Sequence, residues 1–226
     1  MLAANAITKS HKHQTALRGV DIEIASGEIK VVTGPSGAGK STLLRALSLL
    51  DPPDSGVVCI DGERYNFPKD RFRKMHPWPK ITVVFQQHFL WPHLTIRENV
   101  LLPVQDCPSG NDTRDLERIT ETLGIKPLFN RYPNEVSQGE RQRTAIARAI
   151  MLKPRYLLLD EITSALDSAQ IVLMEQILST LKHQNVGMLV ITHDLQFAES
   201  IADTVLVMEN GVMKPSLVPL HCTSGI

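Results

Sequence analysis

The sequence predicts an α/β fold with a buried, parallel-stranded sheet, and three observations support this prediction. A glycine-rich loop at residues 34–41 stands between a β-like run and a helical pattern. Two acidic residues, Asp160 and Glu161, directly follow an apolar run at 156–159. From residue 155 onward, short apolar runs alternate with amphipathic helical patterns, as they do in α/β domains whose parallel strands are covered on both faces.

The length and composition fit a single folded unit. The chain has 226 residues, of which 42% are hydrophobic, enough for one large α/β domain that contains an insertion. Lys and Arg together number 24, as do Asp and Glu, so the composition gives no reason to expect nucleic acid or an anionic membrane surface as a partner. Three widely spaced cysteines predict reduced thiols in a cytosolic protein: Cys59, Cys107 and Cys222. The N-terminal residues are too polar for a signal peptide, and no apolar run is long enough to predict a membrane span.

The first elements alternate between strand and helix. Residues 20–24 and 28–33 predict two strands, the second of which leads into the glycine-rich loop. Residues 40–50 predict a helix that stops before a pair of prolines. A further strand is expected at 57–60, where an Asp-Gly turn pair closes it.

The middle of the chain follows a different pattern. Residues 112–124 and 137–152 predict two amphipathic helices, whereas 77–108 is rich in proline and aromatic residues. We therefore expect a mainly helical insertion in the α/β core. The remaining elements follow this insertion: strands at 156–159, 188–191 and 204–208, and a helix at 168–183.

The loop at 34–41 has the pattern Gly-x-x-x-x-Gly-Lys-Ser, which is typical of a phosphate-binding loop between a strand and a helix. Its glycines let backbone N–H groups curve around phosphate oxygens, and the following helix adds the positive charge of its N-terminus. Lys40 is expected to reach the β- and γ-phosphates of ATP, and Ser41 to coordinate Mg²⁺. The alternative, a plain glycine-rich turn, is disfavoured by the strand–helix context. The residues expected at the nucleotide are Gly34, Pro35, Ser36, Gly37, Ala38, Gly39, Lys40, Ser41 and Thr42.

The acidic pair after the apolar run predicts the hydrolytic part of the same site. In open α/β sheets, ligands bind at the carboxyl ends of the strands. Asp160 is expected to hold Mg²⁺, directly or through water, and Glu161 to polarise an attacking water molecule. The alternative, acids that merely favour a helix start, carries little weight beside a phosphate loop.

Four further segments resemble motifs of the ABC-type ATPases and make that resemblance specific. In chain order they are Gln86 in Val-Val-Phe-Gln-Gln, Ser-Gln-Gly-Glu at 137–140, Ser-Ala-Leu-Asp at 164–167, and His193 in Thr-His-Asp. With the loop and the acidic pair, they cover essentially the whole chain. The resemblance implies a single domain, 1–226, with a P-loop NTPase (RecA-like) core that includes an N-terminal antiparallel β subdomain. The core would comprise 1–86 and 155–226, and the inserted helical subdomain 87–154.

The resemblance also assigns roles to the matching residues. Gln86 would contact Mg²⁺ and the attacking water, and His193 would hold the γ-phosphate and that water. Ser137 and Gly139 would contact ATP bound by a second subunit, while Asp167 would help to form the interface between the subunits. Each residue also has a structural alternative; Ser137, for example, begins a plain helix capping box.

Three positions depart from the family pattern. Gln138 replaces the usual glycine and adds bulk near the expected dimer interface. Ile162 replaces a proline after Glu161, and we expect little effect. His11 stands where the family has an aromatic residue that stacks on adenine. An imidazole can stack there with its smaller face, but His13 or a purely solvated histidine are alternatives.

The resemblance implies an ATP-binding and ATP-hydrolysing subunit that powers an ABC transporter, most like importers of polar amino acids. Residues 164–167 and 89–95 resemble that group, and 131–135 lack the acidic, glycine-containing segment of exporters. Lipoprotein-release and cell-division subunits, which usually carry Gly-Asn-Leu-Asp at the position of 164–167, are an alternative. Further alternatives are a non-transport ABC ATPase, which usually has tandem cassettes or basic arms, and a regulatory module without turnover, against which Glu161 argues.

The expected partners follow from the same resemblance. They are a second ATPase subunit, in the simplest case a second copy of this chain, and integral membrane permease subunits. A substrate-binding protein would take part indirectly, and no nucleic acid is expected. Exposed aromatic residues at 89–91 could form the groove that receives a permease helix, or could pack the insertion. The expected location is the cytoplasmic face of the inner membrane, as a peripheral protein with ATP and Mg²⁺ as ligands.

Overall fold

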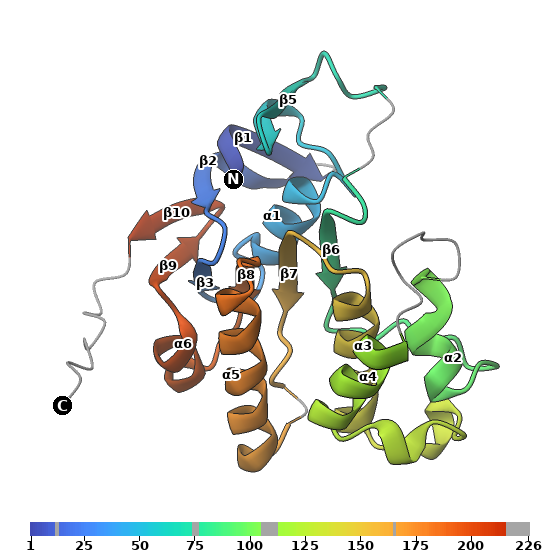
Figure 1. Ribbon diagram of the computed structural model, residues 1–226. Coiled ribbons are helices and arrows are strands. Elements are labelled where there is room, and N and C mark those ends of the chain that lie inside the picture. The colour runs from blue at the N-terminus through green and yellow to red at the C-terminus, as the bar shows by residue number, and fades with distance from the viewer. Residues whose placement is uncertain (12–13, 74–76, 105–112, 165, 216–226) are drawn as a thin grey trace.

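Two β-sheets form the frame of the molecule (Figure 1). The computed structural model describes all residues except 12–13, 74–76, 105–112, 165 and 216–226. The smaller sheet is antiparallel, in the order β2-β1-β4-β5, and therefore agrees with the predicted N-terminal β subdomain. Its strands are β1 (Leu2–His11), β2 (Gln14–Ile24), β4 (Ser55–Ile60) and β5 (Glu63–Phe67).

The larger sheet has the order β10-β9-β3-β8-β7-β6. Its five strands from β9 to β6 are parallel, and β10 pairs antiparallel with β9 at the edge. The α/β fold class predicted from the sequence is confirmed. The strands are β3 (Ile29–Thr33), β6 (Ile81–Val84), β7 (Tyr156–Asp160), β8 (Gly187–Ile191), β9 (Thr204–Glu209) and β10 (Val212–Pro215).

Hydrophobic cores cover both faces of the larger sheet, as a parallel sheet requires. Leu158 of β7 points into a core shared with the antiparallel sheet and with the buried leucines of α1 (Lys40–Leu47). Its neighbours Leu157 and Leu159 point into the second core, which is formed with the helices on the other face. Two of those helices are α5 (Ser168–His183) and α6 (Leu195–Ile201).

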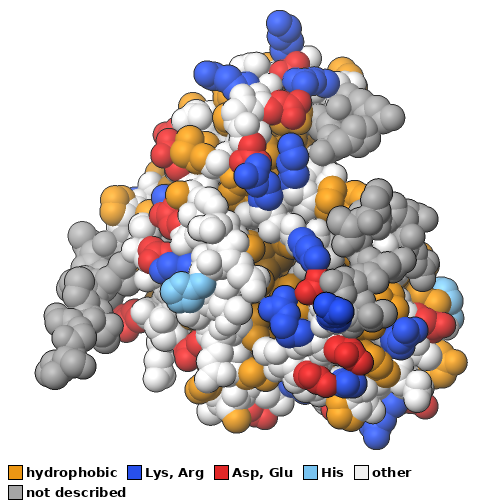
Figure 2. Space-filling model, in the orientation of Figure 1, with side chains coloured by type: hydrophobic (Ala, Val, Ile, Leu, Met, Phe, Trp, Pro, Cys, Tyr) orange, Lys and Arg blue, Asp and Glu red, His pale blue; other side chains and the backbone are white. Residues whose placement is uncertain are grey.

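Between β6 and β7, the elements in the described part of the chain are all helical. They are α2 (Ile96–Leu101), η1 (Leu102–Val104), α3 (Thr113–Thr122), η2 (Lys126–Leu128), η3 (Pro133–Glu135) and α4 (Gln138–Met151). In Figure 1 they lie together on one side of the sheets. Figure 2 shows hydrophobic side chains exposed along the middle of the same view, with Lys, Arg, Asp and Glu interspersed around them.

Two differences from the predicted elements have local causes. The helix expected at 40–50 ends at Leu47, because Leu49 adopts a left-handed backbone with φ 58° that cannot continue an α-helix. The helix α2 was not predicted, although its start carries a capping box. The Glu98 N–H donates to Thr95 Oγ1 at 3.3 Å, and the Thr95 N–H donates to Glu98 Oε2 at 2.8 Å.

Candidate nucleotide-binding site

The phosphate loop connects the carboxyl end of β3 to the first turn of α1. Two of its glycines are pressed against backbone from other parts of the chain. A Cβ atom on Gly34 would lie 2.1 Å from the carbonyl oxygen of Met208, and one on Gly39 would lie 2.3 Å from that of Ala16. Both glycines also have positive φ, at 137° and 106°. Only glycine fits at these two positions, and a tightly turned glycine-rich loop at the start of a helix is a cradle that suits phosphate oxygens.

Lys40 is buried at the start of α1, and its side chain folds back across the loop. Its Nζ donates to the carbonyl oxygens of Gly34 at 2.7 Å and Pro35 at 2.8 Å. The ammonium group therefore lies over the cradle, next to the positive end of α1. The lysine and the helix N-terminus together bring positive charge to this loop, which favours binding of a negatively charged triphosphate.

Asp160 and Glu161 leave the carboxyl end of β7 in different directions. Asp160 is buried and lines the same cavity as Ser41. Burial raises the pKa of Asp160, and Glu161 raises it further, although Ser41 and Lys40 act in the opposite direction. Glu161 has φ 49°, a left-handed conformation that turns the chain out of the sheet. Its own N–H donates to Ile191 O of β8 at 2.9 Å and fixes this turn.

Gln86 and His193 meet Glu161 at the same edge of the sheet. Gln86 Nε2 donates to Glu161 Oε2 at 3.0 Å, and His193 Nδ1 lies 3.7 Å from Glu161 Oε1. The three residues follow β6, β7 and β8, which are neighbours in the parallel sheet. The sheet topology therefore brings together side chains that are far apart in the sequence.

A cavity of about 340 Å³ joins Gln86 and Glu161 to the phosphate loop, whereas His193 does not line it and reaches the site through its contact with Glu161. Gln14 and Ala16, which the sequence analysis missed, belong to its wall because the β1–β2 pairing carries them there. No local motif marks either residue. The residues that line the cavity are His11, Gln14, Ala16, Ser36, Gly37, Gly39, Lys40, Ser41, Thr42, Gln86, Asp160 and Glu161.

The side chains in this cavity fit a magnesium nucleotide. Ser41, Asp160 and Gln86 offer a hydroxyl, a carboxylate and an amide oxygen, which are the hard oxygen ligands that Mg²⁺ prefers. Within the described ranges, no group of three or more His, Cys, Asp or Glu side chains that could hold a metal ion is found. A single carboxylate with further oxygen ligands and phosphates is the usual arrangement for Mg²⁺.

His11 lies at the end of β1, on the wall of the cavity, with 51% of its side chain exposed. The alternative residue, His13, lies outside the described residues. The structure therefore places His11 beside the phosphate loop, although the two come from different sheets.

Ser137, Gly139 and Asp167 do not line this cavity. Ser137 is the N-cap of α4, where its N–H donates to Glu140 Oε2 at 2.7 Å and its hydroxyl accepts from the Glu140 N–H at 3.3 Å. Asp167 caps α5, and its Oδ1 accepts from the Gln170 N–H at 2.9 Å. Within one chain, Ser137 and Asp167 therefore stabilise helix starts away from the phosphate loop.

A second and larger cavity, which we call the groove, has a volume of about 480 Å³ and lies just beyond Gln86. Phe89 lines it, is exposed, and packs edge-on against Phe85 with ring centroids 5.9 Å apart. Arg148 of α4 fixes this segment by donating to His88 O at 2.7 Å and Phe89 O at 2.8 Å. Trp91 is also exposed but does not line the cavity. The aromatic residues after Gln86 thus divide between the groove and the surrounding surface.

None of the helices in the described ranges is long and apolar enough to span a membrane.

Comparisons with known proteins agree with the site. The sequence profile of the ABC transporter family matches residues 17–164. The arginine transport ATP-binding protein ArtP of Escherichia coli (strain K12) is 40% identical over 217 residues, which cover 92% of this chain and 88% of that protein. The glutamine transport ATP-binding protein GlnQ of the same organism is 36% identical over 216 residues, with 93% and 88% covered. Among solved structures, the dimeric bacterial ABC transporter cassette MJ0796 superposes with a TM-score of 0.83 at 31% identity, covering 95% of this chain and 98% of that one. The chain therefore belongs to the ABC transporter family.

Proposed function

We propose that this chain binds and hydrolyses ATP to power an ABC importer of polar amino acids. The observation that carries the proposal is the meeting of the phosphate loop with Gln86, Asp160, Glu161 and His193 at one edge of the sheet. Similarity to proteins of arginine and glutamine transport supports the substrate class.

The proposed reaction is an attack of water on the γ-phosphorus of ATP. A bond forms between the water oxygen and that phosphorus, and the bond to the β–γ bridging oxygen breaks with its electron pair passing to ADP. The water gives up one proton by way of Glu161 to solvent, and ADP and inorganic phosphate leave. Glu161 accepts a hydrogen bond from the water and polarises it. His193 holds the water and the γ-phosphate, while Lys40 and the loop N–H groups bind the β- and γ-phosphates.

Mg²⁺ would be held by Ser41, Asp160 and Gln86. When bound, the ion supplies positive charge beside the phosphate oxygens. The shared cavity supports this assignment, because Ser41 at the start of α1 and Asp160 at the end of β7 both line it and so bring two oxygen ligands to the phosphate loop. Gln86 would then connect the ligand sphere to the segment that carries the groove.

A complete site would need a second subunit, in the simplest case another copy of this chain. Ser137 and Gly139 lie at the capped N-terminus of α4, where N–H groups and the helix dipole favour a phosphate. We propose that they contact ATP held by the second subunit and that Asp167 borders the interface. The similarity to a dimeric cassette supports this arrangement. Gln138 is exposed at the same helix start and would add bulk between the subunits.

The groove beyond Gln86 is the proposed contact with membrane permease subunits. Its exposed hydrophobic residues include Leu50, Trp78 and Phe89, a composition suited to an amphipathic helix. Residues 87–154 would act as a helical subdomain that passes the nucleotide state to this contact. The chain would lie peripherally on the cytoplasmic face of the inner membrane, and a substrate-binding protein would take part indirectly.

The catalytic assignment is tested by Glu161→Gln. Phosphate release should fall by roughly a hundredfold or more, because the amide is a poor acceptor for the water proton, while ATP binding is retained. Size-exclusion chromatography with ATP should show a closed dimer that accumulates. The matched control is Glu199→Gln, which changes an exposed acid on α6 and should leave turnover intact. Normal phosphate release by Glu161→Gln would disprove the assignment.

The transport role is tested by co-purification from detergent-solubilised membranes. The expected result is recovery of this chain with integral membrane subunits that contain no nucleotide-binding loop of their own. Recovery with ribosomes or DNA, and with no membrane subunit, would contradict a transport function.

A further inference from the structure

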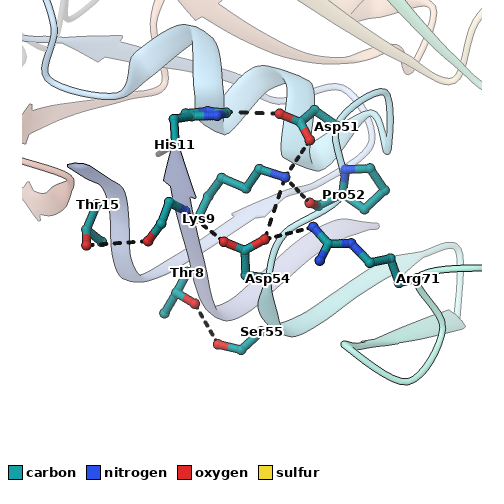
Figure 3. Close-up of polar contacts among 10 residues, drawn as sticks. Thr8, Lys9, His11, Thr15, Asp51, Pro52, Asp54, Ser55 and Arg71 are labelled. Carbon is teal, nitrogen blue, oxygen red and sulfur yellow. Dashed lines mark hydrogen bonds and ion pairs between the residues drawn. The ribbon is translucent and has the colours of Figure 1, made fainter. Parts of the chain in front are cut away.

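Charged contacts connect the end of β1 to the segment that follows α1 (Figure 3). Lys9 is only 4% exposed, and its ammonium donates to Asp51 Oδ1 and, at 2.6 Å, to Pro52 O. The other oxygen of Asp51, Oδ2, lies 3.9 Å from Nε2 of His11. One carboxylate therefore faces both the buried lysine and the histidine on the wall of the cavity.

Lys9 keeps Asp51 in place for a physical reason. A buried ammonium group is costly unless oxygens surround it, and the oxygens of Asp51 and Pro52 serve this purpose. Asp54 adds a third contact, with its Oδ1 3.8 Å from Lys9 Nζ. Asp51 could turn away from His11 only by giving up its hydrogen bond to the lysine.

Asp54 belongs to the same cluster but faces elsewhere. Its Oδ2 accepts from the Ser10 N–H at 2.8 Å, and its Oδ1 accepts from Arg71 at 2.8 Å. Burial tends to raise the pKa of Asp54, but the Ser10 N–H, Lys9 and Arg71 together hold it below the ordinary value. In Figure 3, Asp54 lies on the Arg71 side of Lys9 and Asp51 on the His11 side. The two acids thus offer a comparison within one cluster.

The position of Asp51 relates His11 to the phosphate loop. The helix α1 begins at Lys40, in the loop, and ends at Leu47, four residues before Asp51. His11 lines the same cavity as the loop. The approach of Asp51 Oδ2 to His11 Nε2, at 3.9 Å, therefore relates the imidazole to the helix that presents the phosphate-binding groups.

We propose that Asp51 is a positioning residue for nucleotide binding: anchored by Lys9, its carboxylate holds the His11 imidazole at the purine end of the cavity. The proposal rests on the proposed ATP site and on the expectation from the sequence that His11 stacks on the adenine. An imidazole offers a smaller face than other aromatic side chains, and it is half-exposed here. Restricting its movement before binding lowers the entropy lost when it packs on the base, so its small contact contributes more to affinity.

The test distinguishes binding of the adenine base from binding of the phosphates. ADP and inorganic pyrophosphate are titrated in the presence of Mg²⁺ by calorimetry into the full chain and its variants. Asp51→Asn keeps the size of the side chain and an oxygen acceptor for Lys9, so folding should be retained, as melting curves can verify. It should weaken ADP binding roughly two- to fivefold, because contacts between half-exposed polar side chains contribute little, and leave pyrophosphate binding unchanged. His11→Ala should weaken ADP roughly fivefold or more, again without an effect on pyrophosphate.

The control and the double variant make the result specific. Asp54→Asn changes the other acid beside Lys9 and should leave the affinity for ADP unchanged. The double variant His11→Ala with Asp51→Asn should bind ADP as weakly as His11→Ala alone, because Asp51 acts only through the imidazole.

Each contrary outcome has a separate meaning. If Asp51→Asn weakens ADP and pyrophosphate alike, or still weakens ADP when His11 is already alanine, Asp51 acts elsewhere and the proposal is wrong. If His11→Ala weakens ADP but Asp51→Asn does not, the proposal is wrong while the role of His11 stands. If His11→Ala leaves ADP binding unchanged, His11 does not contact the base, and the proposal fails although the ATP site is untouched.

Discussion

The phosphate end and the proposed purine end of the cavity are built in different ways. The phosphate end is one continuous segment, 34–41, in which Gly34 and Gly39 are held against backbone carbonyls. At the purine end, His11 of the antiparallel sheet faces Asp51, which follows α1. Lys9 holds this aspartate, although the two residues are 42 positions apart in the sequence. Backbone geometry forms the first end, and side-chain contacts between distant segments form the second.

This difference has a consequence for how the two ends tolerate change. At the phosphate end, Gly34 and Gly39 have no room for a side chain, because an added methyl group on either would meet a carbonyl oxygen. The purine end is half-exposed, and its residues can be exchanged with smaller effects. We therefore expect substitutions at the phosphate end to affect all phosphate ligands, and those at the purine end to affect only ligands with a base.

The largest effect is expected for Gly34→Ala. A Cβ atom would lie 2.1 Å from Met208 O, and φ is 137°, so the loop must move. Binding of ADP should be lost, and the free energy of unfolding should fall by about 2–4 kcal/mol. Gly37→Ala is the matched control, since no atom lies within 4 Å of its Cβ position and φ is 78°. Gly37→Ala should lower the free energy of unfolding by only about 1 kcal/mol. Urea unfolding and titration with ADP measure both variants. Equal effects would show that contact with β9 does not shape the loop.

A smaller effect is expected for Lys40→Ala. Removal of the ammonium group takes away charge-assisted hydrogen bonds to phosphate, so ADP should bind roughly ten- to a hundredfold more weakly. Pyrophosphate should lose the same factor, in contrast to Asp51→Asn and His11→Ala. Titration calorimetry with both ligands measures the two losses. A loss confined to ADP would mean that the two ends of the cavity are not separable.

The smallest effect is expected at a contact that holds the two sheets together. Asp61, in the turn between β4 and β5, accepts hydrogen bonds from the Tyr156 hydroxyl at 2.6 Å and from Arg155 at 2.8 Å, at the start of β7. Burial tends to raise the pKa of Asp61, but Tyr156, the N-terminal amine and Arg155 lower it below 3.8. Asp61→Asn should therefore lower the free energy of unfolding by about 1 kcal/mol at neutral pH.

The pH dependence of that effect follows from the sign of the pKa shift. A carboxyl group with a lowered pKa in the folded state stabilises the protein above its unfolded value of 3.8 and loses this contribution as the pH falls through the folded value. The difference between the protein and Asp61→Asn should thus be constant near neutrality and shrink below pH 3.8. Urea unfolding at pH 7 and at about pH 3 measures it. A difference that grows in acid would contradict the assignment.

Elements stabilised by local interactions were predicted well, and an element stabilised by long-range pairing was not. Strong local patterns located most elements well: the helix expected at 168–183 is α5, with the same bounds, and the apolar run at 156–159 lies within β7. The strand β1 was not predicted as an element, because its pattern is irregular and it is stabilised by pairing with both β2 and β4. Long-range pairing cannot be read from a local window.

The sequence by itself determined the phosphate loop, the acidic pair and the capping box at Ser137, because each depends on residues adjacent along the chain. Only the tertiary structure decided which distant residues join them. The order of β6, β7 and β8 brought Gln86 and His193 to Glu161, and the pairing of β1 with β2 brought His11 and Gln14 to the loop. The physical reason is that backbone conformation depends on near neighbours, whereas the meeting of side chains depends on sheet topology and on burial, as the contact of Lys9 with Asp51 illustrates.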